Sequence, residues 1–189
     1  MKDTIHQEAD GKQHIRIMFE DEARFGRISD PRSCWAPEGI RPAVGVQIVH
    51  EYTYAFAAVS PLDGVLDSLV LPEVNTDTMS IFLNEVSIRH IDEYIIMFAD
   101  GAGWHKALNL NIPKNIKLLF LPPYSPELNP AEHIWDEIRE KSFANVVFKT
   151  ITTVEDTLVD ALAALENHHE KVQSLTGFDW IISSIMNAT

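Results

Sequence analysis

Alternating and continuous apolar segments along the chain predict a sheet that begins as an antiparallel meander. Residues 14 to 19 alternate and then run apolar, which is typical of a strand that ends in Glu20, Asp21 and Glu22. Residues 44 to 50 and 52 to 59 have the same character. After a turn at Pro61, Asp63 and Gly64, residues 65 to 72 continue the antiparallel pattern.

The second half of the chain predicts strands that alternate with helices. Near-continuous apolar runs at 94–99 and 116–121 indicate strands that are buried on both faces. Helical spacing predicts helices from Thr76 or Asp77 to Ile91, over 106–110, over 151–171 with Thr152 or Thr153 as the cap, and near 178–185. A meander followed by strand–helix units predicts an α/β fold in which helices cover both faces of a mixed sheet.

Residues 121 to 140, LPPYSPELNPAEHIWDEIRE, join a strand end, a proline-rich turn and an amphipathic helix. Asn129 stands where an N-cap would stand, and Glu132 lies three positions later, a variant of the capping box. The apolar stripe on the helix that follows comprises Ala131, Ile134, Trp135 and Ile138. We therefore expect Glu132 in the first turn of a helix that packs on the core.

Charge and composition narrow the class of protein. The formal net charge of −13 argues against a domain that binds nucleic acid through its overall charge alone. Seven of the fifteen basic residues nevertheless lie in the first 41 positions, so a basic patch near one end is expected. The single cysteine, Cys34, leaves no internal disulfide, and no apolar run is long enough to span a bilayer.

Carboxylates stand at the ends of the predicted strands. Asp21 and Asp100 each directly follow an apolar strand, and Glu132 opens the helix after the next strand. Three acids that converge at the carboxyl end of a sheet repel one another unless a cation is present, and oxygen ligands favour Mg²⁺ or Mn²⁺. Each acid also has a simpler interpretation as a turn or helix cap. Glu20 and Glu22, on the opposite side of the strand, are alternative ligands to Asp21.

Four segments together carry a resemblance to a known family: FEDEARFG, WAPEGIRP, FADGAGWH and LPPYSPELNPAEHIWDEIRE. They resemble the DDE endonuclease domain of mariner-like insertion-sequence transposases over residues 14 to 145. The resemblance implies an RNase H-like mixed five-stranded sheet and divalent-metal-dependent cleavage and strand transfer of DNA. It places the catalytic and metal-binding triad on Asp21, Asp100 and Glu132, with two Mg²⁺ ions for which Mn²⁺ can substitute.

The chain departs from the family pattern in three ways. Gly101 stands where the family commonly has asparagine, and the separation of the second and third acids is 132 − 100 = 32 residues, shorter than usual. No helix-turn-helix segment is recognisable, so residues 1–189 are expected to be a single catalytic domain without the N-terminal DNA-binding portion. The expected partners are transposon ends, target DNA and a second copy of the chain assembled on DNA, in a prokaryotic cytoplasm.

The segment from 23 to 42 is interrupted by Gly and Pro and is expected to be a long loop. The resemblance suggests that Arg24, Arg27 and Trp35 from this region contact DNA or a partner subunit. His105 and Lys106 are further candidates for contacts with DNA, although an aromatic residue beside a glycine turn more often packs and a surface lysine is more often simply solvated.

Two other functions fit the same pattern. An RNase H-type nuclease would keep the fold and the metal chemistry but would not join strands. A non-catalytic remnant that serves as a dimerisation or protein-binding module would keep the fold without metal affinity.

Overall fold

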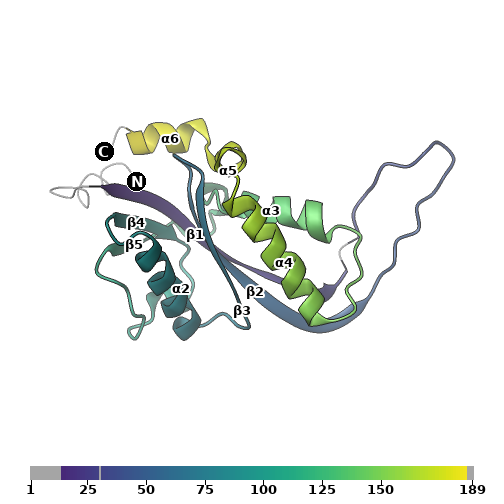
Figure 1. The fold of residues 1–189 in the computed structure, drawn as a ribbon, viewed down its shortest axis with the longest axis horizontal. Coiled ribbons are helices and arrows are strands. Elements are labelled where there is room, and N and C mark those ends of the chain that lie inside the picture. The colour runs from purple at the N-terminus through teal and green to yellow at the C-terminus, as the bar shows by residue number, and fades with distance from the viewer. Residues whose placement is uncertain (1–13, 30, 187–189) are drawn as a thin grey trace.

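The computed structural model describes residues 14–29 and 31–186. Over these residues one five-stranded sheet has the strand order β3-β2-β1-β4-β5. The strands are β1 (Ile15–Ile28), β2 (Ile48–Ser60), β3 (Val65–Leu71), β4 (Tyr94–Ala99) and β5 (Ile116–Phe120). β1, β2 and β3 pair antiparallel, whereas β4 and β5 run parallel to β1. The predicted mixed five-stranded sheet is thus confirmed (Figure 1).

Helices lie on both faces of this sheet, as the alternation of strands and helices predicts. The helices are α2 (Thr76–Arg89), α3 (Glu132–Ile138), α4 (Ile151–Glu166), α5 (His169–Thr176) and α6 (Asp179–Met186), and the short turns are η1 (Trp104–Lys106), η2 (Pro126–Leu128) and the π-turn η3 (Arg139–Phe143). α2 covers one face, and α3, α4 and α5 cover the other (Figure 1). None of the helices in the described ranges is long and apolar enough to cross a membrane.

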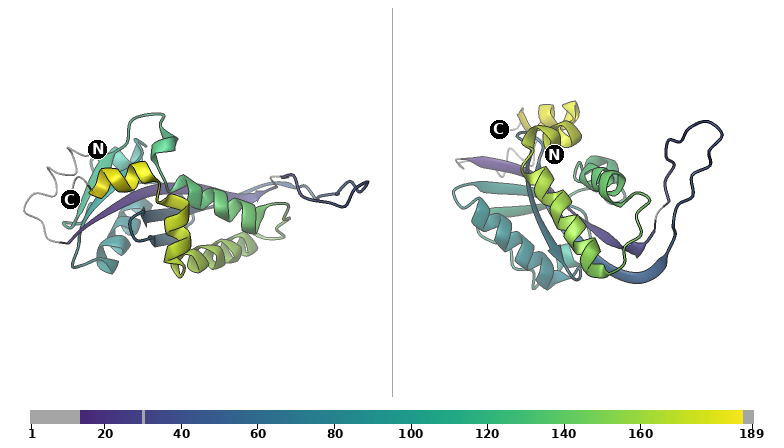
Figure 2. Two further views of the ribbon diagram at one scale, coloured as in Figure 1. Left: turned by 90° about the horizontal axis from the view of Figure 1, so that it is seen from above. Right: turned by 45° about the vertical axis from the view of Figure 1, so that its right-hand side comes forward.

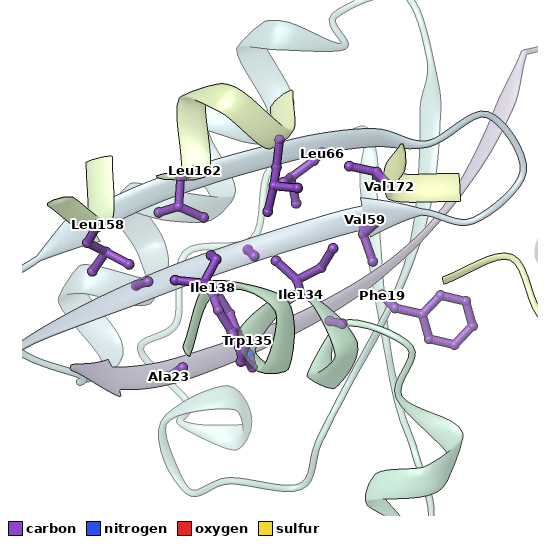
Figure 3. Packing of buried hydrophobic residues seen from close by; sticks show 14 of the residues in the cluster. Phe19, Ala23, Val59, Leu66, Ile134, Trp135, Ile138, Leu158, Leu162 and Val172 are labelled. Carbon is purple, nitrogen blue, oxygen red and sulfur yellow. The ribbon is translucent and has the colours of Figure 1, made fainter. Parts of the chain in front are cut away.

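The larger core lies between the sheet and α3, α4 and α5. Trp135 and Ile138 of α3 meet Leu158 and Leu162 of α4 over the central strands (Figure 3). Trp135 is the largest fully buried side chain of the described residues, with 1% of its surface exposed. Burying such a side chain removes much apolar surface from water, so α3 is anchored firmly to the sheet. This anchoring holds the start of α3 in place.

β1 is more than twice as long as expected. The prediction that it ends near residue 19 is wrong, because β1 continues to Ile28 through the acidic triplet. An antiparallel ladder with β2 satisfies its backbone along this stretch, from the pair Phe19–Val59 onward. The parallel pairing with β4, in contrast, stops at Phe19 and Phe98. Asp21 therefore lies within a strand, two residues past the point where β4 leaves it.

The connection between β1 and β2 also differs from the expected pattern. The two strands predicted over 44–50 and 52–59 are one strand, β2, which begins at Ile48. Residues 31–47 form a narrow arm that projects away from the body of the domain (Figure 2). Trp35 lies on this arm with its side chain fully exposed. The predicted long loop is confirmed from residue 31, whereas residues 23–28 belong to β1.

The caps of two helices lie earlier in the chain than expected, by one or two residues at α2 and by two or three at α4. Asn75, rather than Thr76 or Asp77, caps α2, and its side chain accepts from the backbone N–H groups of Asp77 and Thr78. Thr150 caps α4 in the same way. The single helix predicted over 151–171 is two helices, α4 and α5, that meet at an angle.

Candidate active site

Three carboxylates from distant parts of the chain line one pocket at the carboxyl end of β4. Asp100 directly follows β4, Asp21 projects from β1 beside it, and Glu132 is the first residue of α3. The pocket has a volume of about 470 Å³. No lysine, arginine or histidine is among the described residues that line it. The three acids singled out by the sequence are therefore brought together in an environment without a compensating cation.

The ionisation of Asp21 is strongly perturbed by its surroundings. Burial raises the pKa of its carboxyl from 3.8 to about 8, and the neighbouring Glu132 carboxylate adds to the rise. The indole N–H of Trp135 opposes this shift, because it donates to Asp21 Oδ2 at 2.7 Å. Trp135 was expected only to fill the core. The sequence gives no signal for this second role, which depends on how α3 lies across β1.

Glu132 does not close the expected capping box. The N-cap of α3 is Ala131, which offers no side-chain hydrogen bond, so the prediction of Asn129 as the cap is wrong. Asn129 is instead buried, accepts from the backbone N–H of Ala131 at 3.2 Å and donates to the Glu20 carbonyl at 2.9 Å. The η2 turn before Pro130 delays the start of the helix by two residues. Asn129 therefore ties the start of α3 to β1.

Asp100 is positioned by the turn that follows β4. Its Oδ1 accepts from the backbone N–H of Ala102 at 2.9 Å and lies 2.9 Å from His105 Nδ1. His105 belongs to η1, which takes the place of the short helix expected over 106–110. Asp100 therefore lines the pocket and also contacts His105, which lies outside the pocket.

Glu20 and Glu22 face away from Asp21, as strand alternation predicts, and so do not line the pocket. Glu22 Oε1 accepts from Trp104 Nε1 at 2.8 Å and lies 2.9 Å from His105 Nε2. Burial, together with the neighbouring Glu22 carboxylate, raises the pKa of Glu20 well above its usual range. The acids of β1 are therefore divided between two separate clusters.

The candidates for contact with DNA have different surroundings. Arg24 is exposed and stacks on the ring of Tyr52, whereas Arg27 is held by Glu51 at 2.6 Å and by the Phe148 carbonyl at 3.0 Å. Both arginines line a small hollow that Arg32 and Arg139 also line. A cluster of guanidinium groups is chemically suited to phosphate, so Arg24 and Arg27 remain predictions for DNA contact.

His105 and Lys106 also differ from each other, because His105 is buried and Lys106 is exposed. His105 has 2% of its surface exposed and its two ring nitrogens face the carboxylates of Asp100 and Glu22, so its side chain offers no surface to DNA. Lys106 is exposed beside the mouth of the pocket, with its ammonium 5.1 Å from the centre of the Phe120 ring.

Comparison with known proteins identifies the family of this protein. Residues 16–155 match the family described as DDE superfamily endonuclease, a stretch that contains Asp21, Asp100 and Glu132. The chain belongs to this family. A curated relative of this DDE endonuclease domain is "Uncharacterized protein y4pE/y4sA" of Sinorhizobium fredii (strain NBRC 101917 / NGR234). The two are 36% identical over 131 residues, which is 68% of this chain and 96% of the relative.

Solved structures of similar fold include complexes of the mariner transposase Mos1. The paired-end complex with Mg has a TM-score of 0.61 at 20% identity and covers 100% of this chain and 61% of that chain. The strand transfer complex has a TM-score of 0.58 at 17% identity and covers 99% of this chain and 59% of that chain. These similarities confirm the predicted RNase H-like fold. The DDE endonuclease domain described above thus spans about three-fifths of the length of the Mos1 chains.

Proposed function

We propose that this DDE endonuclease domain is the catalytic part of a transposase that cleaves DNA at transposon ends and joins the freed end to target DNA. The observation that carries the proposal is the convergence of Asp21, Asp100 and Glu132 in one pocket. Membership of the DDE superfamily supports the nuclease chemistry, and the fold shared with Mos1 complexes supports the transposase assignment.

The pocket fits divalent cations on chemical grounds. Its charged ligands are carboxylates only, which suits Mg²⁺ or Mn²⁺, and no basic side chain lines the described part of the pocket. The raised pKa of Asp21 reflects a burial cost that a cation would remove. Asp21, Asp100 and Glu132 are the residues that would hold the two ions.

The reaction follows from placing a phosphodiester in this pocket. Water attacks the phosphorus, the bond to the 3′ oxygen breaks, and the strand is left with a 3′-hydroxyl and a 5′-phosphate. That 3′-hydroxyl then attacks a phosphodiester of the target and displaces its 3′ oxygen. The bound Mg²⁺ ions supply positive charge that stabilises the oxygens of both in-line displacements. The task of the protein is to hold the three carboxylates in register, through Trp135 on Asp21 and the Ala102 N–H on Asp100.

The remaining parts of the proposal concern DNA and assembly. Arg24 and Arg27 are suited to the phosphate backbone, and Lys106 stands beside the mouth of the pocket. Trp35 on the projecting arm is available to DNA or to a second copy of the chain. We place the active form as a homodimer on DNA that works with an N-terminal DNA-binding portion on the chromosome of a prokaryotic cell.

Strand transfer in Mn²⁺ tests this function directly. The full chain is incubated with a labelled oligonucleotide that bears a 3′-hydroxyl and with supercoiled plasmid, and joined products are counted. Asp21→Asn, Asp100→Asn and Glu132→Gln should each lower joining by roughly a thousandfold, as expected for the loss of several kcal/mol of transition-state stabilisation. Glu127→Gln is the matched control, because Glu127 is exposed on η2 and does not line the pocket.

The products distinguish the proposal from its rivals. Metal-dependent cleavage without joining would indicate the RNase H-type nuclease. Neither cleavage nor Mn²⁺ binding by calorimetry would indicate the non-catalytic module and would refute the proposed function. Joining that is unaffected by the three substitutions would refute the assignment of the site.

A further inference from the structure

A second cluster of potential metal ligands lies on the opposite side of β1 from the pocket. Glu20, Glu22 and His105 each offer one ligand atom, and these atoms lie within 4.8 Å of one another. Glu20 and Glu22 point to the face that α2 covers, and His105 reaches them from η1. Asp21 and Glu132 line the pocket on the other face.

The Glu20 carboxyl has no hydrogen-bond partner. It is fully buried, with 0% of its surface exposed, and neither carboxylate oxygen has a hydrogen-bond partner. Its Oε2 lies 3.5 Å from His105 Nε2, so the group is aimed into the cluster. A buried carboxyl without a hydrogen-bond partner is costly, and native proteins retain one where something else compensates it.

The hydrogen bonds around His105 favour a metal as that compensation. His105 Nδ1 lies 2.9 Å from Asp100 Oδ1 and 3.2 Å from the Asp100 carbonyl oxygen, two acceptors for a proton on Nδ1. The lone pair of a neutral ring then sits on Nε2, which faces Glu22 Oε1 at 2.9 Å and Glu20 Oε2 at 3.5 Å. A metal-binding histidine commonly donates its other N–H to a carboxylate in this manner.

Glu22 has the surroundings of a metal-bound carboxylate as well. The indole N–H of Trp104 donates to Glu22 Oε1 at 2.8 Å and fixes its direction. Without a metal, a doubly protonated His105 pairs with Asp100 and Glu22, and the Glu20 carboxyl, whose pKa burial raises, is left buried without a hydrogen bond. A dication compensates all three side chains together.

We propose that Glu20, Glu22 and His105 bind a transition-metal dication, with Zn²⁺ as its probe, at a structural site separate from the catalytic pocket. One imidazole and two carboxylate ligands suit zinc better than magnesium. Ligand atoms about 2.1 Å from a tetrahedral zinc are about 3.4 Å apart. The observed 3.5 Å fits this value, and the 2.9 Å pair needs to open by about 0.5 Å.

Such a site would position Asp100 through His105. The metal fixes Nε2, and Nδ1 holds Asp100 Oδ1 at the mouth of the catalytic pocket. The site does not depend on the proposed transposase function, because none of its three ligands lines that pocket.

Zinc stoichiometry tests the site. The full chain is stripped with a chelator, unfolded, refolded with Zn²⁺ and dialysed, and bound zinc is measured by mass spectrometry of the metal. Wild type and the Asp21→Asn/Glu132→Gln double variant should each retain a single ion. Glu20→Gln and His105→Ala should lose it to background, with circular dichroism as the check that each variant folds.

An anomalous difference map at the zinc edge on wild-type crystals locates the ion without any substitution. A peak bounded by the side chains of Glu20, Glu22 and His105 supports the site. Zinc that is absent from refolded wild type, that persists in Glu20→Gln, or that gives a peak elsewhere overturns it. The crystal measurement decides the question even if a variant does not fold.

Discussion

Replacing Asp21 with asparagine should change how the stability of the metal-free domain depends on pH. Asparagine has the same shape, and its Oδ1 can still accept from Trp135 Nε1, now 2.7 Å from Asp21 Oδ2. The substitution therefore removes the ionisation of residue 21 and keeps its packing. In wild type that ionisation is opposed by burial and by the Glu132 carboxylate.

The sign and size follow from the two pKa values. In the unfolded chain Asp21 ionises near pH 3.8, and in the folded chain its pKa is about 8. Between these values the folded state holds a proton that the unfolded state has released, so the free energy of unfolding falls as pH rises. Each pH unit in this window costs up to about 1.4 kcal/mol, so the step from pH 5 to pH 8 costs at most about 4 kcal/mol.

Urea unfolding followed by circular dichroism at pH 5 and pH 8 measures this loss. A chelator is present throughout, because a cation in the pocket would stabilise the ionised form. Wild type should lose about 2–4 kcal/mol more than Asp21→Asn over this step. Glu20, whose pKa is also raised, contributes to both proteins, and most of its contribution cancels because burial and Glu22 raise that pKa more than the Asp21 carboxylate does. Asp136→Asn, at an exposed position on α3, is the matched control and should behave as wild type.

Equal losses in wild type and Asp21→Asn would refute the reasoning. That result would mean that Asp21 ionises in the folded state as readily as in water, and that the pocket is not an environment that requires a cation. A similar change in Asp136→Asn would show that general surface charge, rather than Asp21, sets the pH dependence.

Three further substitutions test the packing that supports the site, each measured by urea unfolding. Gly64→Ala should cost about 2–5 kcal/mol, because φ is +70° and a Cβ would collide with the backbone carbonyl of His169. Leu162→Ala should lower the free energy of unfolding by about 2–5 kcal/mol, since the Leu162 side chain of α4 is only 2% exposed and packs in the core. Trp135→Phe should cost about 1.5–3 kcal/mol at pH 9, where Asp21 is ionised and loses its donor.

Each of these substitutions has a control of the same type on the surface. Gly39→Ala, at φ +81° with nothing within 4 Å of the new Cβ, should cost only about 1 kcal/mol of backbone strain. Leu108→Ala and Trp35→Phe, at fully exposed positions, should change stability by less than about 0.5 kcal/mol. Equal effects within any pair would show that the packing described here does not determine the cost.

Local patterns predicted the elements best where one strand or helix carries its own signal. The apolar run of β4 was located to the residue, and β5 and α2 to within two residues. β1 was cut short because Glu20, Asp21 and Glu22 look like the end of a strand. Its continuation depends on the ladder with β2, a partner about 35 residues away along the chain. Such long-range pairing overrides local preference.

The sequence by itself determined the α/β class and most of the strands and helices, because these depend on local periodicity. The family resemblance carried by its motifs selected Asp21, Asp100 and Glu132 from the acids at the strand ends. Only the tertiary structure decided that Trp135 donates to Asp21 and that Asn129 ties α3 to β1. It also decided that His105 joins Glu20 and Glu22 in a buried cluster. These contacts join residues more than 80 positions apart, and their geometry is set by how the helices and turns pack on the sheet.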